Sequence, residues 1–198
     1  QGFVKDYTNA PAPGFPKESA SCPGVQSGMP NDVTAVEALI RIPSNAHGFS
    51  YDFSFYAYDF PQFVCSQYDD FFFSVLLPSP AGSPDGVLSY DELGGPVSLN
   101  GANFRVCGCQ NGPPCTAGNK MFACPLGTGQ LQGTGFGAGM GNNMDRGATG
   151  WLTTMVPVTP GDQVSLRWGV YDSGDGQFDS TVVIDNWLPR RGPVREPL

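Results

Sequence analysis

Residues 48–63 alternate aromatic side chains with small or polar ones, in the order GFSYDFSFYAYDFPQF. Phe49, Tyr51, Phe53 and Phe55 occupy alternate positions, so they would share one face of an extended strand. A strand with one wholly aromatic face has to bury that face against other parts of the chain. The segment therefore predicts a long strand within a β-sheet.

Other segments support a chain made of strands. The run DDFFFSVLLPSP is continuously apolar after its two aspartates, which predicts a strand covered on both faces and placed in the centre of a sheet. The stretch DVTAVEALIRIP fits a helical or an extended pattern, and Pro43 favours the strand. Three further strands are expected in the last third, separated by TPGD and by DSGDGQFDS, which we interpret as a β-hairpin loop. We find no convincing helix and no internal repeat.

Composition agrees with short strands joined by many turns. The 198 residues include 27 Gly and 19 Pro, yet 40% are hydrophobic and 12% aromatic, which is too apolar for a disordered chain. We predict one disulfide-stabilised, antiparallel β-sandwich of jelly-roll type over residues 33–188. A Pro-, Gly- and Ser-rich arm over residues 1–32 precedes it, and a tail over residues 189–198 follows it.

The chain contains six cysteines, and their number and spacing favour disulfides over a zinc site. They are Cys22, Cys65, Cys107, Cys109, Cys115 and Cys124. The spacing of the last four does not match paired CxxC zinc knuckles, and no histidine lies between them. We predict that Cys22 pairs with Cys65, the only two outside the local group, and that the other four pair among themselves. Three disulfides indicate an oxidising, extracytoplasmic compartment.

The charge balance excludes some partners. The net charge is −8, with only 10 Lys and Arg, so a nucleic-acid backbone would be repelled. No apolar run approaches the ~20 residues that span a bilayer, so no transmembrane segment is expected. The remaining partners are a surface glycan or another extracellular protein.

The acidic stretch DSGDGQFDS is a candidate cation site. Ca²⁺ takes six to eight oxygen ligands, and a bound cation would neutralise the three like charges of this loop. Three aspartates cannot comfortably supply so many oxygens, so we expect help from the acidic segments YDFPQF and QYDDFF. The predicted Ca²⁺ ligands are Asp59, Asp69, Asp70, Asp172, Asp175 and Asp179.

Signals for catalysis are weak. The run GTGFGAG lacks the preceding strand and following helix that a nucleotide-binding fingerprint needs. His47 is the only histidine, and no nucleophile elbow is recognisable, so acid–base chemistry would rest on aspartates alone. We therefore expect no enzymatic activity.

Two blocks of the chain resemble the choice-of-anchor L family of secreted and surface bacterial proteins, in the cysteine-bearing form frequent in myxobacterial exported proteins. The first block carries Asp59-Phe60-Pro61, and the second carries Gly174-Asp175 followed by Asp179-Ser180. The chain has Asp69-Asp70 where the family often has Asn-Asp. The resemblance covers residues 33–188 and implies a β-sandwich surface module, and it leaves the ligand open.

We therefore expect a non-catalytic binding or structural module, secreted or displayed on a bacterial surface, with a structural Ca²⁺ site. One alternative is a carbohydrate-binding adhesion domain that presents Tyr56, Tyr58 or Trp151 to a glycan. A second alternative is a glycan or peptide hydrolase that uses Asp59 with Asp69 or Asp70.

Overall fold

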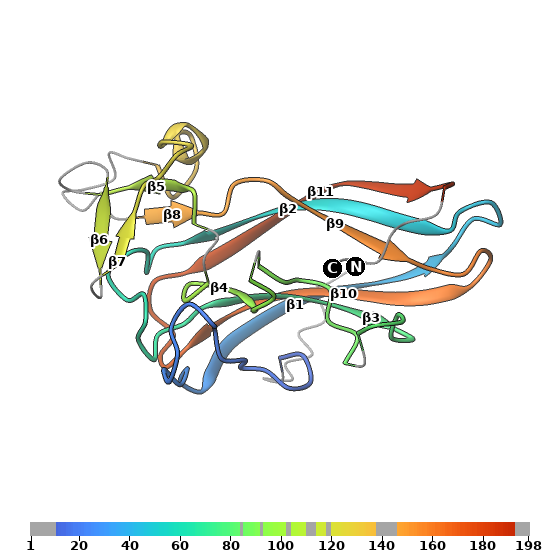
Figure 1. The fold of residues 1–198 in the computed structure, drawn as a ribbon, viewed down its shortest axis with the longest axis horizontal. Helices are drawn as coiled ribbons and strands as arrows, with labels where there is room; N and C mark the ends of the chain where they lie inside the picture. The colour runs from blue at the N-terminus through green and yellow to red at the C-terminus, as the bar shows by residue number, and fades with distance from the viewer. Residues whose placement is uncertain are drawn as a thin grey trace, which may run out of the picture.

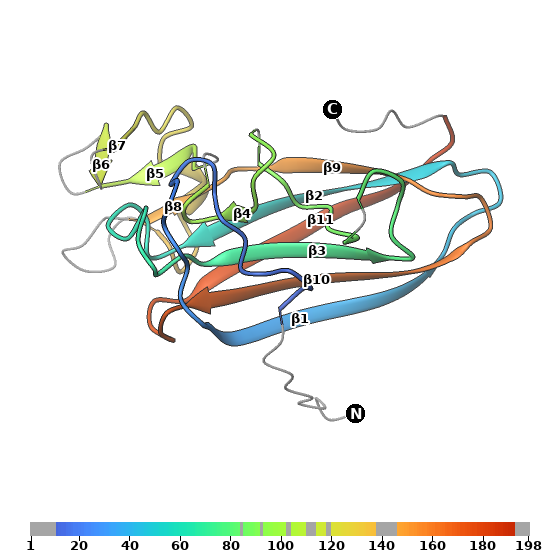
Figure 2. The ribbon, with the colours of Figure 1, turned by 60° about the horizontal axis from the view of Figure 1, so that its bottom comes forward.

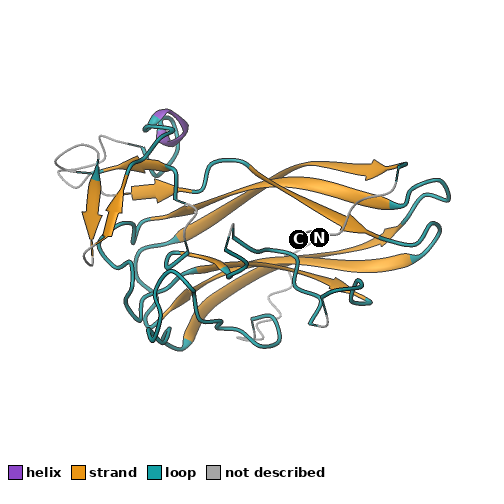
Figure 3. Ribbon diagram, in the orientation of Figure 1, coloured by secondary structure: helices purple, strands orange, loops and turns teal. Residues whose placement is uncertain are grey.

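The computed structural model describes residues 11–83, 85–91, 93–101, 104–109, 114–117, 120–137 and 146–192. Two antiparallel sheets lie in two layers (Figures 1 and 3). The first has the order β1-β10-β3-β4 and comprises β1 (Pro30–Arg41), β10 (Gln163–Ser173), β3 (Phe71–Leu77) and β4 (Val97–Ser98). The second has the order β11-β2-β8-β5 and comprises β11 (Ser180–Arg190), β2 (Gly48–Ala57), β8 (Arg146–Ala148) and β5 (Val106–Gly108).

Three smaller pieces complete the described structure. Strand β9 (Leu152–Pro157) pairs with β2 beyond β8. Strands β6 (Cys115–Ala117) and β7 (Lys120–Phe122) form a separate ribbon, and one 3₁₀ turn, η1, spans Gly129–Leu131. The prediction of an all-β, antiparallel, disulfide-stabilised sandwich is confirmed, whereas jelly-roll connectivity stays a prediction.

Alternation along the strands divides apolar side chains between the inside and the outside of the sandwich. Phe53 of β2 packs on Phe72 of β3 between the sheets, with ring centroids 4.6 Å apart. Tyr51 lies beside Phe53 in this inner core, and its hydroxyl donates to Ser74 Oγ at 2.6 Å. The aromatic face predicted for residues 48–63 is thus the buried face of β2.

The first sheet is also covered on its outer face. Phe71 and Phe73 point away from Phe72 and join a second apolar cluster with Tyr171 of β10. Phe15 of the N-terminal arm packs on Phe71 edge-to-face, with ring centroids 5.7 Å apart. Strand β3 is therefore covered on both sides and lies between β10 and β4, as its continuous apolar run predicted.

The segment between residues 172 and 180 is not a hairpin loop, contrary to the prediction. Strand β10 pairs with β1 and β3 on its two sides, so it offers no free edge to β11. Strand β11 pairs instead with β2 in the other sheet. The segment therefore crosses from one layer to the other at the end of the sandwich that lies on the left in Figures 1 and 2.

Candidate cation site at one end of the sandwich

Three buried carboxylates meet where this crossing occurs, and we call Asp59, Asp70 and Asp172 the acidic cluster. Asp59 lies just beyond β2 of the second sheet, and Asp70 lies just before β3 of the first. Asp172 is the next-to-last residue of β10. Their residues are 4%, 1% and 7% exposed. Three chain segments from two sheets therefore bring acidic side chains to one place.

Strand alternation explains why Asp70 belongs to this cluster and Asp69 does not. Residues two apart in an extended chain face the same side. Asp70 therefore faces the inner core with Phe72, whereas Asp69 faces the outer cluster with Phe71. Asp69 instead accepts hydrogen bonds from the backbone N–H of Asn100 at 2.8 Å and from the hydroxyl of Ser27 at 3.0 Å. Its carboxylate therefore ties the arm and the 98–101 turn to β3.

A hydrogen bond links the acidic cluster across the two sheets. The Ser180 hydroxyl, at the start of β11, donates to Asp70 Oδ2 at 2.6 Å. The charge of Asp59 raises the pKa of Asp70, so ionisation of one of these carboxyl groups disfavours ionisation of the other. A bound cation would offset this repulsion.

Burial raises the pKa of every carboxyl group in the acidic cluster. The pKa of Asp59 rises to about 7, with the charges of Asp172 and Asp175 adding to burial. The pKa of Asp70 rises to about 8 through burial and the charge of Asp59. The pKa of Asp172 also rises to about 8 through burial and neighbouring carboxylates. Among the described residues, every charge that shifts these three pKa values is negative.

The crossing loop and β1 add further carboxylates. Asp175 is half-buried and accepts a hydrogen bond from the N–H of Gln177 at 3.0 Å, while Asp179 is exposed. Asp32, which the sequence did not single out, also raises the pKa of Asp172 by its charge. A Cβ on Gly176 would lie 2.5 Å from Asp32 Oδ2, so glycine lets the loop pass beside this carboxylate.

Two buried hydroxyls beside the cluster have no hydrogen-bond partner among the described residues. Tyr171 is 1% exposed, and its pKa is raised well above its usual range by burial and by the charges of Asp69 and Asp70. Ser173, the residue after Asp172, is 2% exposed and equally unpartnered. Tyr171 stacks on Phe71 in the outer cluster, with ring centroids 5.1 Å apart, and Ser173 shares its face of β10. Both hydroxyls therefore lie on the opposite face of the strand from Asp172 and are not part of the acidic cluster.

The six cysteines form three disulfides, so the prediction that all are oxidised is confirmed. Cys22 pairs with Cys65, Cys107 with Cys124, and Cys109 with Cys115. In the part of the chain that the structure describes, Cys107, Cys115 and Cys124 are the one group of three potential ligand residues whose atoms lie within 4.8 Å of each other. Their sulfur atoms are used in disulfides, so this group is not a metal site. No three carboxylates of the acidic end are that close together.

The residues weighed for other functions lie elsewhere or are inaccessible. Tyr56 is buried, Tyr58 packs on Phe136 with ring centroids 4.5 Å apart, and Trp151 is 49% exposed. His47 is exposed and lies just before β2, at the opposite end of that strand from Asp59. Asp59 and Asp70, weighed for hydrolysis, are both buried. Of the three aromatic residues weighed for glycan binding, Trp151 is the exposed one.

Comparisons with family models, curated proteins and solved structures found no match for this chain. The resemblance to the choice-of-anchor L family therefore stays a prediction. Within the described residues, no helix has the length and apolar character needed to cross a membrane.

Proposed function

We propose that this chain is a non-catalytic module of a bacterial secreted or surface protein, in which a structural Ca²⁺ joins the two sheets at the acidic cluster. The observation that carries the proposal is the convergence of three buried carboxyl groups, Asp59, Asp70 and Asp172, from both sheets, with no described Lys or Arg among the charges that shift their pKa values. Burying like charges without a counter-charge costs free energy that a divalent ion would recover.

The donor set fits a hard cation. Three carboxylates offer up to six oxygens, and the loop aspartates Asp175 and Asp179 or water supply others. No three of the described carboxylates have oxygens within 4.8 Å of one another, so binding requires their side chains to move closer together.

The extracytoplasmic location rests on the disulfides. Three disulfides in one chain of this size are typical of proteins that fold in an oxidising compartment. Burial of Asp59 and Asp70 supports a structural rather than a catalytic role, because general acid–base groups must reach a substrate.

Thermal unfolding in EDTA and in CaCl₂ tests the proposal. A ligand that binds only the folded state adds about 2.7 kcal/mol at a hundredfold excess over its Kd. For a chain of this length that free energy raises Tm by about 5–10 °C. Asp70→Asn should abolish the rise, whereas Glu37→Gln, an exposed carboxylate on β1, should preserve it. Equal Tm values in EDTA and CaCl₂, for chain shown by elemental analysis to start metal-free, would refute the calcium site.

A further inference from the structure

Strand β9 has a sheet neighbour on one side only. Its residues pair with β2 in the register Phe49–Val156 and Tyr51–Thr154, and with no other strand of the described chain. Figure 2 shows β9 at the border of its sheet, with β2 on its inner side. Such an edge presents unused backbone N–H and C=O groups in the pattern that another strand recognises.

The neighbouring edge of the first sheet is covered by the chain itself. Strand β3 pairs with β4 at its beginning. Along the rest of β3, Leu88 N donates to Ser74 O at 2.8 Å, and Leu76 N donates to Gly86 O at 2.9 Å. Strand β5 is covered similarly, because Cys107 N donates to Gly127 O at 3.1 Å.

The other two long edge strands carry features that discourage pairing. Strand β1 has a register irregularity near Asp32 and carries the exposed Glu37. Strand β11 has an irregularity between Asp185 and Leu188, and Pro189 follows it. Bulges, charges and proline are the usual protections of an edge. Strand β9, with the sequence LTTMVP, has no charged residue and no bulge, and its proline is at its end.

The direction of the free N–H groups follows from the pairing. Val158 N donates to His47 O at 3.1 Å, continuing the β9–β2 register. Backbone groups of successive residues point to opposite sides of a strand, so Val156 and Thr154 face β2. The N–H groups of Thr153 and Met155 therefore point away from β2, toward the open side.

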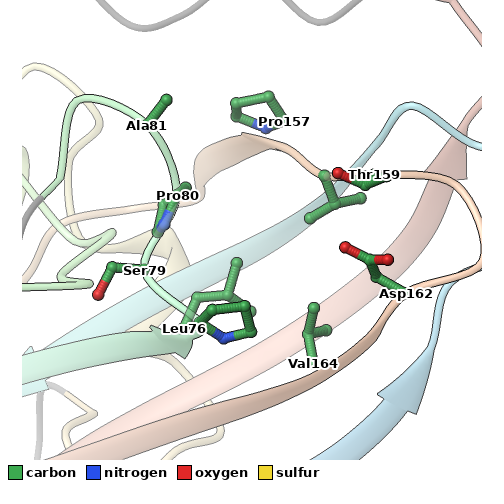
Figure 4. A pocket seen from close by; sticks show the side chains of 10 residues that line it. Leu76, Ser79, Pro80, Ala81, Pro157, Thr159, Asp162 and Val164 are labelled. Carbon is green, nitrogen blue, oxygen red and sulfur yellow. The ribbon is translucent and has the colours of Figure 1, made fainter.

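A groove runs along this open side. Two adjoining hollows, of about 500 and 330 Å³, share Pro80, Ala81 and Pro157. Residues 153–157 form part of the wall of the larger one, and loop residues 80–83 lie opposite. Figure 4 shows the smaller hollow, with Pro80 and Ala81 facing Pro157. Six residues of β9 extend for about 20 Å, the length of an added strand.

The groove contains negative but no positive side chains. Its described lining residues include the exposed Asp162 and no Lys, Arg or His. Asp91 also lies in the lining, but it is 7% exposed and its Oδ1 accepts hydrogen bonds from the N–H groups of Leu93 and Gly95. Lys17, the nearby cation over the Tyr90 ring, is paired with Asp85 at 2.5 Å. The net charge of −8 opposes association with a second copy of the chain and favours a basic partner.

We propose that β9 binds an extended polypeptide segment carrying Lys or Arg, which adds to the sheet as a strand in this groove. Main-chain hydrogen bonds to Thr153 and Met155 provide the affinity, and the exposed Asp162 together with the net negative charge of the chain favours the basic sequence. This interaction surface is independent of the proposed calcium site, which lies at the end of the sandwich where β10 stops.

Synthetic peptides test the main-chain and charge parts separately. The probe is fluorescently labelled KVTVKVT, capped at both ends, with its binding followed by anisotropy in low salt. The first control is the same peptide N-methylated at alternate residues, which keeps the side chains but removes N–H donors. The second is EVTVEVT. We expect saturable binding of the basic peptide and at least about tenfold weaker binding of both controls. Absence of binding, or equal binding of all three peptides, would overturn the proposal.

Protein variants locate the site. Met155→Pro removes one outward N–H without touching the β2 ladder and should weaken binding about tenfold, whereas Met155→Val keeps the N–H and should bind normally. Near-UV circular dichroism checks that both variants are folded. If the proline variant does not fold, the N-methylated peptide still decides the outcome. Equal binding by both folded variants, or a dimer of the chain that Met155→Pro dissociates, would overturn the proposal.

Discussion

Replacing Asp172 by asparagine should stabilise the metal-free chain, although it removes a predicted calcium ligand. Asp172 is 7% exposed, and burial together with the charges of Asp70, Asp179 and Asp32 raises its pKa from 3.8 to about 8. An amide of nearly the same shape has no charge to desolvate and none to repel its neighbours. The substitution should therefore raise the free energy of unfolding at neutral and alkaline pH.

The pKa difference gives the size of this effect. Each pH unit between the folded and unfolded pKa is equivalent to about 1.4 kcal/mol, so 3.8 to about 8 amounts to about 6 kcal/mol. Water around the exposed loop after Ser173 screens part of this electrostatic cost. We therefore expect Asp172→Asn to raise the free energy of unfolding by about a third of it, ~2 kcal/mol, at pH 8. Because Asp172 has a higher pKa in the folded chain than in the unfolded chain, it lowers the free energy of unfolding more and more as pH rises from the unfolded pKa to the folded pKa. The gain should therefore shrink to about 0.5 kcal/mol at pH 5.

Urea unfolding in EDTA at pH 8 and pH 5, with disulfides intact, measures these differences. The midpoint of Asp172→Asn should exceed that of the parent chain at pH 8 and nearly match it at pH 5. Glu37→Gln serves as a control for the loss of one negative charge. A lower midpoint for Asp172→Asn than for the parent at pH 8 in EDTA would refute the reasoning that the acidic cluster is repulsive.

Three other predictions concern the whole sandwich. In EDTA, the parent Tm should fall between pH 5 and pH 8, because carboxyl groups with raised pKa values lose protons in that range, and CaCl₂ should reduce the fall; a Tm that rises instead would contradict the assigned pKa directions. Replacing both Cys22 and Cys65 by Ala should cost about 4 kcal/mol, against about 2 kcal/mol for Cys109 and Cys115, because the first pair closes 43 residues and the second 6; urea unfolding should show that order. Phe72→Ala should cost about 3–5 kcal/mol by the same assay, since Phe72 is fully buried against the second sheet, and a loss below about 1 kcal/mol would place it outside the core.

The sequence predicted the elements whose pattern is local. Alternation in residues 48–63 located β2 and its buried face, and the run at Phe71–Phe73 predicted a strand covered on both sides. Cys22 and Cys65 were paired correctly because they alone lie outside the cysteine group. These features depend on the alternation of side chains along a strand and on the number and positions of the cysteines, both of which can be read directly from the sequence.

The sequence did not predict how the strands are shared between the sheets. The residues 172–180 have the composition of a tight turn, and that composition is equally suited to a hairpin or to a crossing between layers. The pairing of β10 with β1 and β3 decides the matter, and it depends on contacts distant in sequence. Asp32 was missed for the same reason, because only the register of β1 against β10 brings it to Asp172. The separation of Asp69 from Asp70, in contrast, follows from strand alternation and was available from the sequence.

Calorimetric titration of the EDTA-stripped chain with CaCl₂ at pH 7 tests the central claim most directly. Repeating it in two buffers with different ionisation enthalpies counts the protons released. The account predicts one Ca²⁺ per chain and release of at least one proton, because the pKa values of Asp59, Asp70 and Asp172 are raised to about 7, 8 and 8, and carboxyl groups that bind the ion must lose their protons. Absence of saturable binding, or binding that persists unchanged in Asp70→Asn and releases no proton, would contradict a calcium site at the acidic cluster.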